Sequence, residues 1–388
     1  MLAMLVALSP FAIDSYLAAM PIMAKFFKVG TGIIELTITL YFLAFAIGNF
    51  VGGPLSDSFG RKPVALTGMT IYAVSSIIIS LSHTIEPVLF FRALQAFGAG
   101  FATVIANAYI HDLFDGKAVA QIVTKISMIM MLAPLIAPII GAFFIHFKGW
   151  QGVFYFLFGL GGILFLIFLF LIPESLDKSS ISKKISFSRF FEKYKIFFSD
   201  KQSVLLLFSI SFSMAGMYVF LTDASFIYIE YFKINPDFFP ILFGANVILN
   251  ISLSYLNTYL LRFYKVSLLL RAGLLLQLLA GIMVLLSVYF HTPSFWGVFG
   301  GIVLFVGSLG LIFGNGTALI LNKNPKISGS ANATIGILRF LLSFVLGSLL
   351  ALLHTKNIVP FATVIFTCTL LGNIFFALSG SPIAEKNG

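Results

Sequence analysis

The feature that most constrains this fold is the length of its apolar stretches. A helix needs about 20 apolar residues to cross the hydrocarbon core of a bilayer, and nearly the whole chain of 388 residues divides into such runs. Only 10% of the residues are charged, whereas a soluble domain carries about 25%. The sequence therefore predicts an all-α integral membrane protein and excludes an ordinary soluble domain.

We expect twelve membrane-spanning helices in two halves of six. Their predicted bounds are 2–27, 33–56, 64–82, 86–112, 118–146, 150–172, 203–230, 238–261, 266–290, 294–321, 328–354 and 358–380. The halves are residues 1–172 and 203–388, joined by a cytoplasmic linker over 173–202. Residues 187–198 have apolar positions at helical spacing among Lys and Arg, which favours an amphipathic helix on the membrane surface, with disorder as the alternative.

The distribution of Lys and Arg predicts that both termini lie in the cytoplasm, because short cytoplasmic loops collect these residues. The linker alone carries Lys178, Lys183, Lys184, Arg189, Lys193, Lys195 and Lys201. The opposite side receives only Lys25, Lys28, Lys148, Lys233 and Lys356. The net charge of +10 thus belongs to loops on one side and does not indicate a nucleic-acid partner.

A short turn is predicted over residues 53–63, Gly-Pro-Leu-Ser-Asp-Ser-Phe-Gly-Arg-Lys-Pro, between the second and third spans. Gly53 and Gly60 permit close backbone approach and positive φ. Pro63 suits the first turn of the next helix, where its missing N–H costs nothing. Residues 257–265, between the eighth and ninth predicted spans, form a weakly similar counterpart of this turn in the second half.

The charges of this turn carry a family resemblance. Asp57 can pair with Arg61 or face a helix N-terminus, and Arg61 and Lys62 place the turn on the cytoplasmic side. The spacing G-x-L-S-D-x-x-G-R-K-P resembles the loop signature of the major facilitator superfamily, with Ser58 where that family usually has Arg. The resemblance implies a cytoplasmic gate motif of Gly53, Asp57, Gly60, Arg61 and Lys62.

Asp14 lies in the middle of the first predicted span, where charges are costly and are functional candidates by default. Lost hydration favours the protonated carboxyl and a nearby cation favours the charged form, so this group can exchange a proton. The alternative is a structural ion pair between helices. The segment from Asp14 to Pro21 resembles D-x-Y-L-P-A-x-P of the Bcr/CflA branch of drug:proton antiporters, with Ala18 replacing the first proline.

Arg92 is the second buried charge of the first half, and it opens the segment R-A-L-Q-A-F-G-A-G. Gln95 and the glycines Gly98 and Gly100 follow on a small-residue face that permits close helix contact. The segment is similar to the R-x-x-Q-G-x-G pattern of the superfamily's fourth span. That resemblance implies that Arg92 influences the proton site at Asp14; packing with an ion pair is the alternative.

The fifth predicted span carries Pro134 and Pro138, four residues apart on one helix face, with Gly141 three residues beyond. These prolines distort the hydrogen-bond ladder, and neighbouring alanines leave a shallow groove. A kinked, packed helix is the plain interpretation. The pattern is also similar to the antiporter motif of the superfamily, which implies export rather than import.

Asp223 and Arg339 are the intramembrane charges of the second half. If both face a cavity they can pair and favour a polar or charged substrate; an interhelical salt bridge without substrate contact is the alternative. We expect these residues to line a substrate cavity with the polar side chains Tyr16, Gln95, Tyr218, Asn246 and Asn250.

Several functional classes find no support. The single Cys excludes a disulfide framework and a cysteine metal site, and no glycine loop for ATP or hydrolytic triad is present. We therefore expect a non-enzymatic, proton-driven exporter without metal or cofactor. It would carry antibiotics, related metabolites or a siderophore across a bacterial inner membrane, as a monomer by family resemblance. The alternative is a proton-coupled importer of a small polar metabolite.

Overall fold

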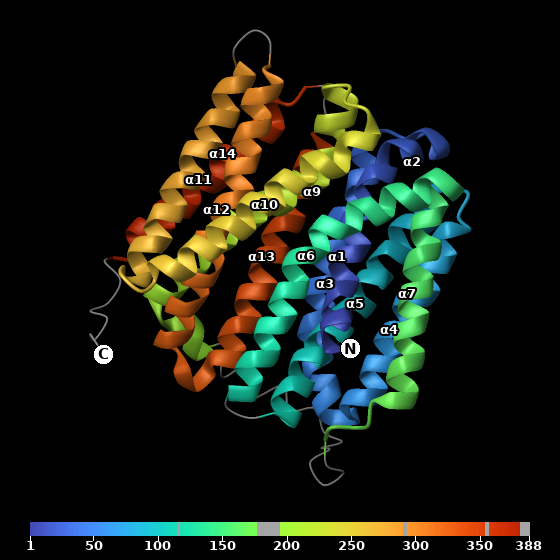
Figure 1. The fold of residues 1–388 in the computed structure, drawn as a ribbon, viewed down its shortest axis with the longest axis horizontal. Coiled ribbons are helices and arrows are strands. Elements are labelled where there is room, and N and C mark those ends of the chain that lie inside the picture. The colour runs from blue at the N-terminus through green and yellow to red at the C-terminus, as the bar shows by residue number, and fades with distance from the viewer. Residues whose placement is uncertain (115–116, 177–194, 290–292, 354–356, 381–388) are drawn as a thin grey trace. The chain divides into compact units, whose positions relative to one another are not determined.

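The computed structural model describes residues 1–114, 117–176, 195–289, 293–353 and 357–380 (Figure 1). Every regular element in these residues is helical, and twelve stretches are long and apolar enough to cross a membrane. The predicted all-α fold with twelve spans is confirmed. The chain forms two compact units, Met1–Ser186 with Ile234–Pro240 (unit 1) and Phe187–Lys233 with Ile241–Gly388 (unit 2).

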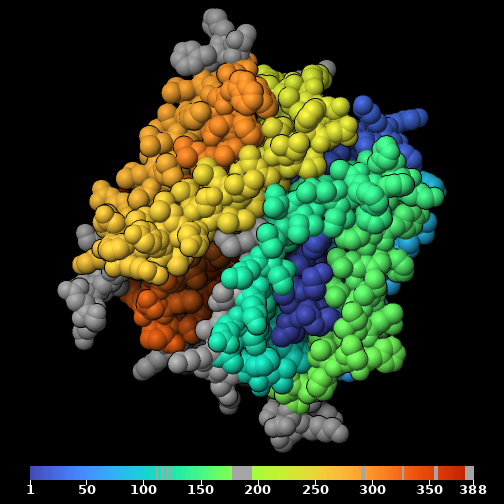
Figure 2. Space-filling view, viewed as in Figure 1, coloured from blue at the N-terminus to red at the C-terminus, as the bar shows by residue number. Residues whose placement is uncertain are grey.

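Unit 1 contains the first six spans. Its helices are α1 (Leu2–Asp14), η1 (Leu17–Ala19), α2 (Met20–Phe27), α3 (Thr31–Phe59), α4 (Arg61–Ser80), α5 (Ile85–Leu113), α6 (Lys117–Lys148) and α7 (Trp150–Leu171). Helix α5 packs on α3 and α4, while α1 packs on α5 and α6. Figure 2 shows the dark blue surface of α1 between α6 and α7.

Small residues let the helices of unit 1 approach closely, as predicted for the face of α5 that carries Gly98. A Cβ added at Gly98 would lie 2.4 Å from the carbonyl oxygen of Gly68 on α4. Helices in a membrane associate through such backbone contacts because lipid provides no hydrophobic drive between them. The face therefore fixes α5 against α4 and so fixes the position of Arg92.

The first span is not one continuous helix. Helix α1 ends at Asp14, a short 3-10 turn covers Leu17–Ala19, and α2 begins at Met20. A proline such as Pro21 interrupts a helix by itself, but here the break begins seven residues earlier, at Asp14. Pro21 has no N–H to give to the carbonyl of Leu17, so the preceding residues tighten into the 3-10 turn.

The predicted turn over residues 53–63 is wrong in length. Helix α3 continues through Gly53 and Pro54 to Phe59, and α4 begins at Arg61, so Gly60 alone joins them. Gly60 has φ +97, but Gly53 is helical, and a Cβ there would meet only a Val104 methyl at 3.9 Å. Helices satisfy their own backbone groups within a bilayer, which favours extending α3 as far as possible.

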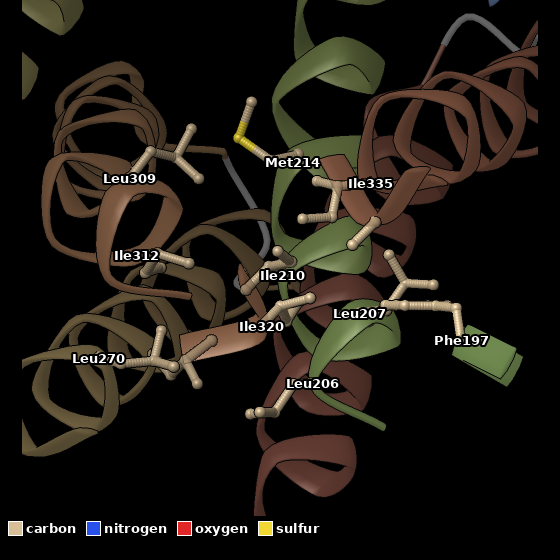
Figure 3. Close-up of a cluster of buried hydrophobic side chains, with 12 residues drawn as sticks. Phe197, Leu206, Leu207, Ile210, Met214, Leu270, Leu309, Ile312, Ile320 and Ile335 are labelled. Carbon is tan, nitrogen blue, oxygen red and sulfur yellow. The ribbon is translucent and has the colours of Figure 1, made fainter. Parts of the chain in front are cut away.

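Unit 2 contains the other six spans. Its helices are α9 (Lys201–Ser225), a π-helical continuation η2 (Phe226–Tyr231), α10 (Phe239–Leu260), α11 (Val266–Tyr289), α12 (Phe295–Lys323), η4 (Pro325–Ile327), α13 (Ser328–Leu352) and α14 (Val359–Leu378). The short η3 (Pro236–Phe238), which precedes α10 in the chain, is assigned to unit 1. Helix α9 packs on α12, α13 and α14. Figure 3 shows its side chains Leu207 and Ile210 in a buried cluster with Ile312 and Ile335.

The start of α9 is held by Asp200. Its carboxylate accepts hydrogen bonds from the Ser203 amide at 3.2 Å and from Lys323 Nζ at 2.7 Å. Partial burial raises the pKa of Asp200, but the hydrogen bonds from Lys323 and Ser203 outweigh it and leave the pKa below its usual value. This ion pair ties the end of α12 to the start of α9.

The predicted amphipathic helix over 187–198 lies mostly outside the described residues, because only 195–198 of it is described. Residues 195–199 are helical, and Phe197 is fully buried in the cluster of Figure 3. The described end of this segment therefore contributes to the core of unit 2.

Candidate functional site

Arg92 on α5 is completely buried and connects three helices of unit 1. Its Nη1 donates to the carbonyl oxygen of Ala12 on α1 at 3.1 Å and to Gln95 Oε1 at 2.7 Å. Gln95 Nε2 in turn donates to Ser76 Oγ on α4 at 2.7 Å. The predicted cavity residue Gln95 is therefore a partner of Arg92.

Aromatic rings take the place of a carboxylate around this guanidinium. Its central carbon lies 4.5 Å from the ring centroid of Tyr16, 4.8 Å from that of Tyr41 and 5.8 Å from that of Phe154. Among the described residues, Arg92 Nε and Nη2 have no hydrogen-bond acceptor. Ring faces stabilise a desolvated cation by about 2 kcal/mol. We call Tyr16, Tyr41, Ser76, Arg92 and Gln95 the Arg92 cluster.

Asp14 is the last residue of α1 and is only 4% exposed. No ion pair joins it to Arg92, and within the described part of the chain its carboxylate makes no hydrogen bond. The two residues are linked indirectly, because Arg92 binds the carbonyl of Ala12, two residues before Asp14, and faces the ring of Tyr16, two residues after it.

Helix α6 packs directly against the break in the first span. A Cβ added at Gly141 would lie 2.1 Å from the carbonyl oxygen of Ser15, the residue after Asp14. Ala133, Ala137 and Gly141 are buried at intervals of four and form the small-residue face predicted from the sequence. Pro134 is half-buried and Pro138 buried, and both lie inside a continuous helix. Of the three predicted residues of this span, Gly141 thus lies directly against the Asp14 segment.

Glu35 is a buried carboxylate that sequence reasoning missed. It lies on α3 and is fully buried. Two residues further along the same helix, Thr37 Oγ1 forms a 2.8 Å hydrogen bond with the Tyr16 hydroxyl of the Arg92 cluster. The rule that singled out Asp14, a charge inside a predicted span, applies equally to Glu35 within 33–56. Unit 1 therefore holds two buried carboxylates, Asp14 and Glu35.

Asp223 and Arg339, the two predicted charges of unit 2, are not joined by an ion pair between their described side chains. Asp223 is buried near the end of α9, whereas Arg339 is half-buried on α13. The guanidinium carbon of Arg339 lies 5.2 Å from the ring centroid of Phe313 on α12. Arg339 thus resembles Arg92 in facing an aromatic ring.

The other predicted cavity residues of unit 2 lie on two helices. The Tyr218 ring on α9 is 4.9 Å from that of Phe340 on α13. On α10, Asn246 is buried and donates to a carbonyl of its own helix at 3.3 Å. Asn250 donates to the carbonyl of Val306 at 3.0 Å and so connects α10 to α12.

Arg61 is the centre of a charged network where α3 meets α4. It forms the predicted ion pair with Asp57 one turn earlier, and its Nη1 also donates to Ser56 Oγ at 2.6 Å. Its Nε donates to Asp112 near the end of α5 at 3.0 Å. The pair with Asp57 is confirmed, and Asp112 is a partner that the sequence analysis did not identify.

Glu174 completes this network, because it caps the first turn of α4. Its two carboxylate oxygens accept the backbone N–H groups of Arg61 at 2.9 Å and of Lys62 at 3.0 Å, a favourable position for an anion at a helix N-terminus. The Lys62 ammonium donates to the carbonyl of Leu169 on α7 at 2.8 Å. The sequence signal that could have identified Asp112 and Glu174 is their position, because both are charged residues close to the end of a predicted span. We call Ser56, Asp57, Arg61, Asp112 and Glu174 the Arg61 cluster.

The matching junction of unit 2 is held by amides. Asn315 Nδ2 on α12 donates to Asn257 Oδ1 on α10 at 2.7 Å, and Asn257 Nδ2 donates back to Asn315 Oδ1 at 3.3 Å. Both side chains are buried. No group of three metal-ligating side chains occurs in either unit within the residues that the structure describes.

Comparison with known proteins gives one family. A model of the Major Facilitator Superfamily matches residues 2–348. The Bicyclomycin resistance protein homolog of Haemophilus influenzae is 29% identical over 388 residues, 100% of this chain and 97% of that protein. The Multidrug resistance protein MdtL of Escherichia coli O157:H7 is 25% identical over 340 residues, 86% and 83% of the two chains. A crystal structure of the D-xylose-proton symporter has the same fold, with a TM-score of 0.76 at 15% identity over 100% and 97% of the two chains.

Proposed function

The chain belongs to the major facilitator superfamily and is a multi-pass membrane transporter, and on this premise we propose that it is a proton-coupled exporter of small organic molecules. Its substrates would be antibiotics or related metabolites, with a siderophore among the candidates. The names of the bicyclomycin and multidrug resistance relatives support this class. We place it in a bacterial inner membrane with both termini in the cytoplasm, as a monomer driven by the proton gradient without a cofactor.

The observation that carries the proposal is the position of Asp14. Its buried carboxylate ends α1 at the break in the first span, beside the Gly141 face of α6. A carboxylate held in an ion pair keeps its charge because the cation stabilises it. Asp14 has no ion pair with Arg92, so taking up a proton there breaks no salt bridge.

In this mechanism Asp14 alternates between a protonated and a charged form, and substrate binding competes with the proton. Arg92 is a positioning residue: it holds the carbonyl of Ala12, two residues before Asp14, and the ring of Tyr16, two residues after it. The Arg92 guanidinium stays protonated, as arginine does in proteins, and faces three aromatic rings, while the charge of Asp14 changes. The Arg61 cluster would hold the cytoplasmic gate, as the resemblance of its motif implies.

The test is proton movement in everted membrane vesicles that carry a preset pH gradient. A panel of antibiotics and metabolites is added to vesicles with the protein, without it, and with the Asp14→Asn variant. We expect at least one compound to collapse the gradient only with the native protein, because export is exchanged for protons. The variant should lose about 100-fold or more of this flux, because Asn cannot take up a proton and a positioned proton-transfer group contributes at least about that factor to a rate.

Two outcomes would contradict the proposal. Full coupling in purified, folded Asp14→Asn would remove Asp14 from proton transfer. Binding of substrate that strengthens as Asp14 takes up a proton would instead support the importer, because symport requires both ligands together. Inorganic phosphate and a neutral sugar in the same panel control for nonspecific leakage.

A further inference from the structure

A cleft of about 690 Å³ lies in unit 2 where α11 begins and α14 ends. Its described lining combines two basic side chains with apolar ones, and none of these residues is acidic; the lining is Lys265, Ser267, Leu268, Arg271, Leu275, Leu278, Asn373, Phe376, Ala377 and Gly380. In Figure 1 the start of α11 and the end of α14 lie at the left side of unit 2.

The lining residues occupy one face of each helix. On α11 they recur at Leu268, Arg271, Leu275 and Leu278, the spacing of neighbours on a helix surface. Lys265 lies just before the helix, and both it and Arg271 are exposed. The groove is therefore basic near the start of α11, at Lys265 and Arg271, and apolar further along the helix, at Leu275 and Leu278.

The depth of the two charges matches a phospholipid headgroup. Helix α11 has 24 residues and is about 36 Å long at 1.5 Å per residue, whereas the hydrocarbon core is about 30 Å thick. Arg271 is the sixth residue of the helix, about 8 Å from its start. A long Arg side chain at that depth reaches back to the interface, where Lys265 already lies.

A second cleft provides a contrast within the same unit. It has a volume of about 520 Å³ and no charged residue in its described lining of Leu279, Ile282, Met283, Leu286, Ser287, Ser294 and Gly297. A lipid tail can contact either groove. Only the first groove also offers cations for an anion.

We infer that the cleft between α11 and α14 binds an anionic phospholipid such as phosphatidylglycerol. The headgroup phosphate is held between Lys265 and Arg271, with the Ser267 hydroxyl as a third donor. One acyl chain lies along Leu275 and Phe376. Asn373 contributes shape rather than a donor, because its Nδ2 already donates to the carbonyls of Leu274 and Thr369, each at 2.9 Å.

The test is native mass spectrometry of the purified full chain with added phosphatidylglycerol, phosphatidylcholine or glycerol 3-phosphate. Each Lys or Arg near a membrane surface weakens anionic-lipid binding about fivefold when removed. We expect Lys265→Gln/Arg271→Gln to bind phosphatidylglycerol about 25-fold more weakly. Arg271→Lys, which keeps the charge, should retain most of the binding.

The matched control is Arg262→Gln, an exposed cation in the same turn that does not line the cleft. It should leave phosphatidylglycerol binding unchanged. Equal binding to the native chain and the folded double variant would overturn the assignment. Phosphatidylcholine binding as tightly as phosphatidylglycerol would also overturn it. So would glycerol 3-phosphate displacing bound phosphatidylglycerol as effectively as added phosphatidylglycerol does, because that result would indicate a site for free phosphate. None of these results depends on Asp14 or on proton coupling.

Discussion

The two halves of the molecule use different side chains to connect their helices at equivalent junctions. Where the second span meets the third, the Arg61 cluster joins α3, α4 and α5 through an Arg and three carboxylates. Where the eighth span meets the ninth, Asn257 and Asn315 join α10 to α12 by a pair of amide hydrogen bonds. The Asp57 side chain is 66% exposed, whereas Asn257 and Asn315 are 8% and 3% exposed.

The difference in exposure suggests a difference in use. An ion pair that reaches water has a small net stability, because water can solvate the separated charges. A buried amide pair is costly to separate, since each group would lose its partner without gaining water. We therefore expect the junction of unit 1 to open and close during transport and the junction of unit 2 to stay joined.

The largest expected effect is that of Arg61→Gln, which removes the cation from Asp57 and Asp112. The exposed pair with Asp57 contributes little, but losing the less exposed bonds to Asp112 and Ser56 costs about 2 kcal/mol, which shifts a two-state equilibrium about 30-fold. We expect substrate-driven proton flux in vesicles to fall at least about tenfold. Arg262→Gln at the matching junction is the control, because Arg262 is exposed and takes part in no ion pair between described residues.

A flux for Arg61→Gln within about twofold of the native rate would show that the charged junction is no more critical than the neutral one. The protein's unfolding temperature in detergent separates this result from a loss of folded protein.

An effect of similar size, on folding stability instead of transport, is expected from Gly60→Ala. The φ of +97 at Gly60 is unfavourable for other residues, and an added Cβ would lie 2.6 Å from Glu174 Oε2. We expect the free energy of unfolding to fall by about 2 kcal/mol. Gly53→Ala is the matched variant: Gly53 is inside α3, and an added Cβ would make only an ordinary contact with Val104 at 3.9 Å, so Ala should be neutral or stabilising by up to about 1 kcal/mol.

Thermal unfolding of both glycine variants in the same detergent checks this prediction. Equal destabilisation by the two substitutions would mean that the chain does not turn at Gly60 alone.

The smallest effect is expected at the amide pair of unit 2, where a second substitution should restore part of the stability that the first one removes. Either Asn257→Leu or Asn315→Leu alone leaves a buried amide without its partner, which costs about 1–2 kcal/mol. Replacing both removes the unsatisfied groups, so the double variant should be more stable than either single one. Additive losses in the unfolding temperatures would contradict the idea of a reciprocal pair.

Sequence alone determined the class of this protein and the number of its spans. Runs of about 20 apolar residues have few alternatives to membrane helices. The twelve predicted spans correspond to twelve helical stretches, and the helix ends differ from the predicted ones by a few residues. The ion pair of Asp57 and Arg61 was also predictable, because residues four apart are neighbours on a helix or across a short turn.

The partners of the buried charges were decided by the tertiary structure. Arg92 had to find an acceptor, but the sequence did not show that it would face the rings of Tyr16 and Tyr41 and the carbonyl of Ala12 instead of the carboxylate of Asp14. Glu174 is 113 residues from Arg61 and still caps its helix. Such contacts depend on which helices lie side by side, which the local periodicity of the chain does not encode.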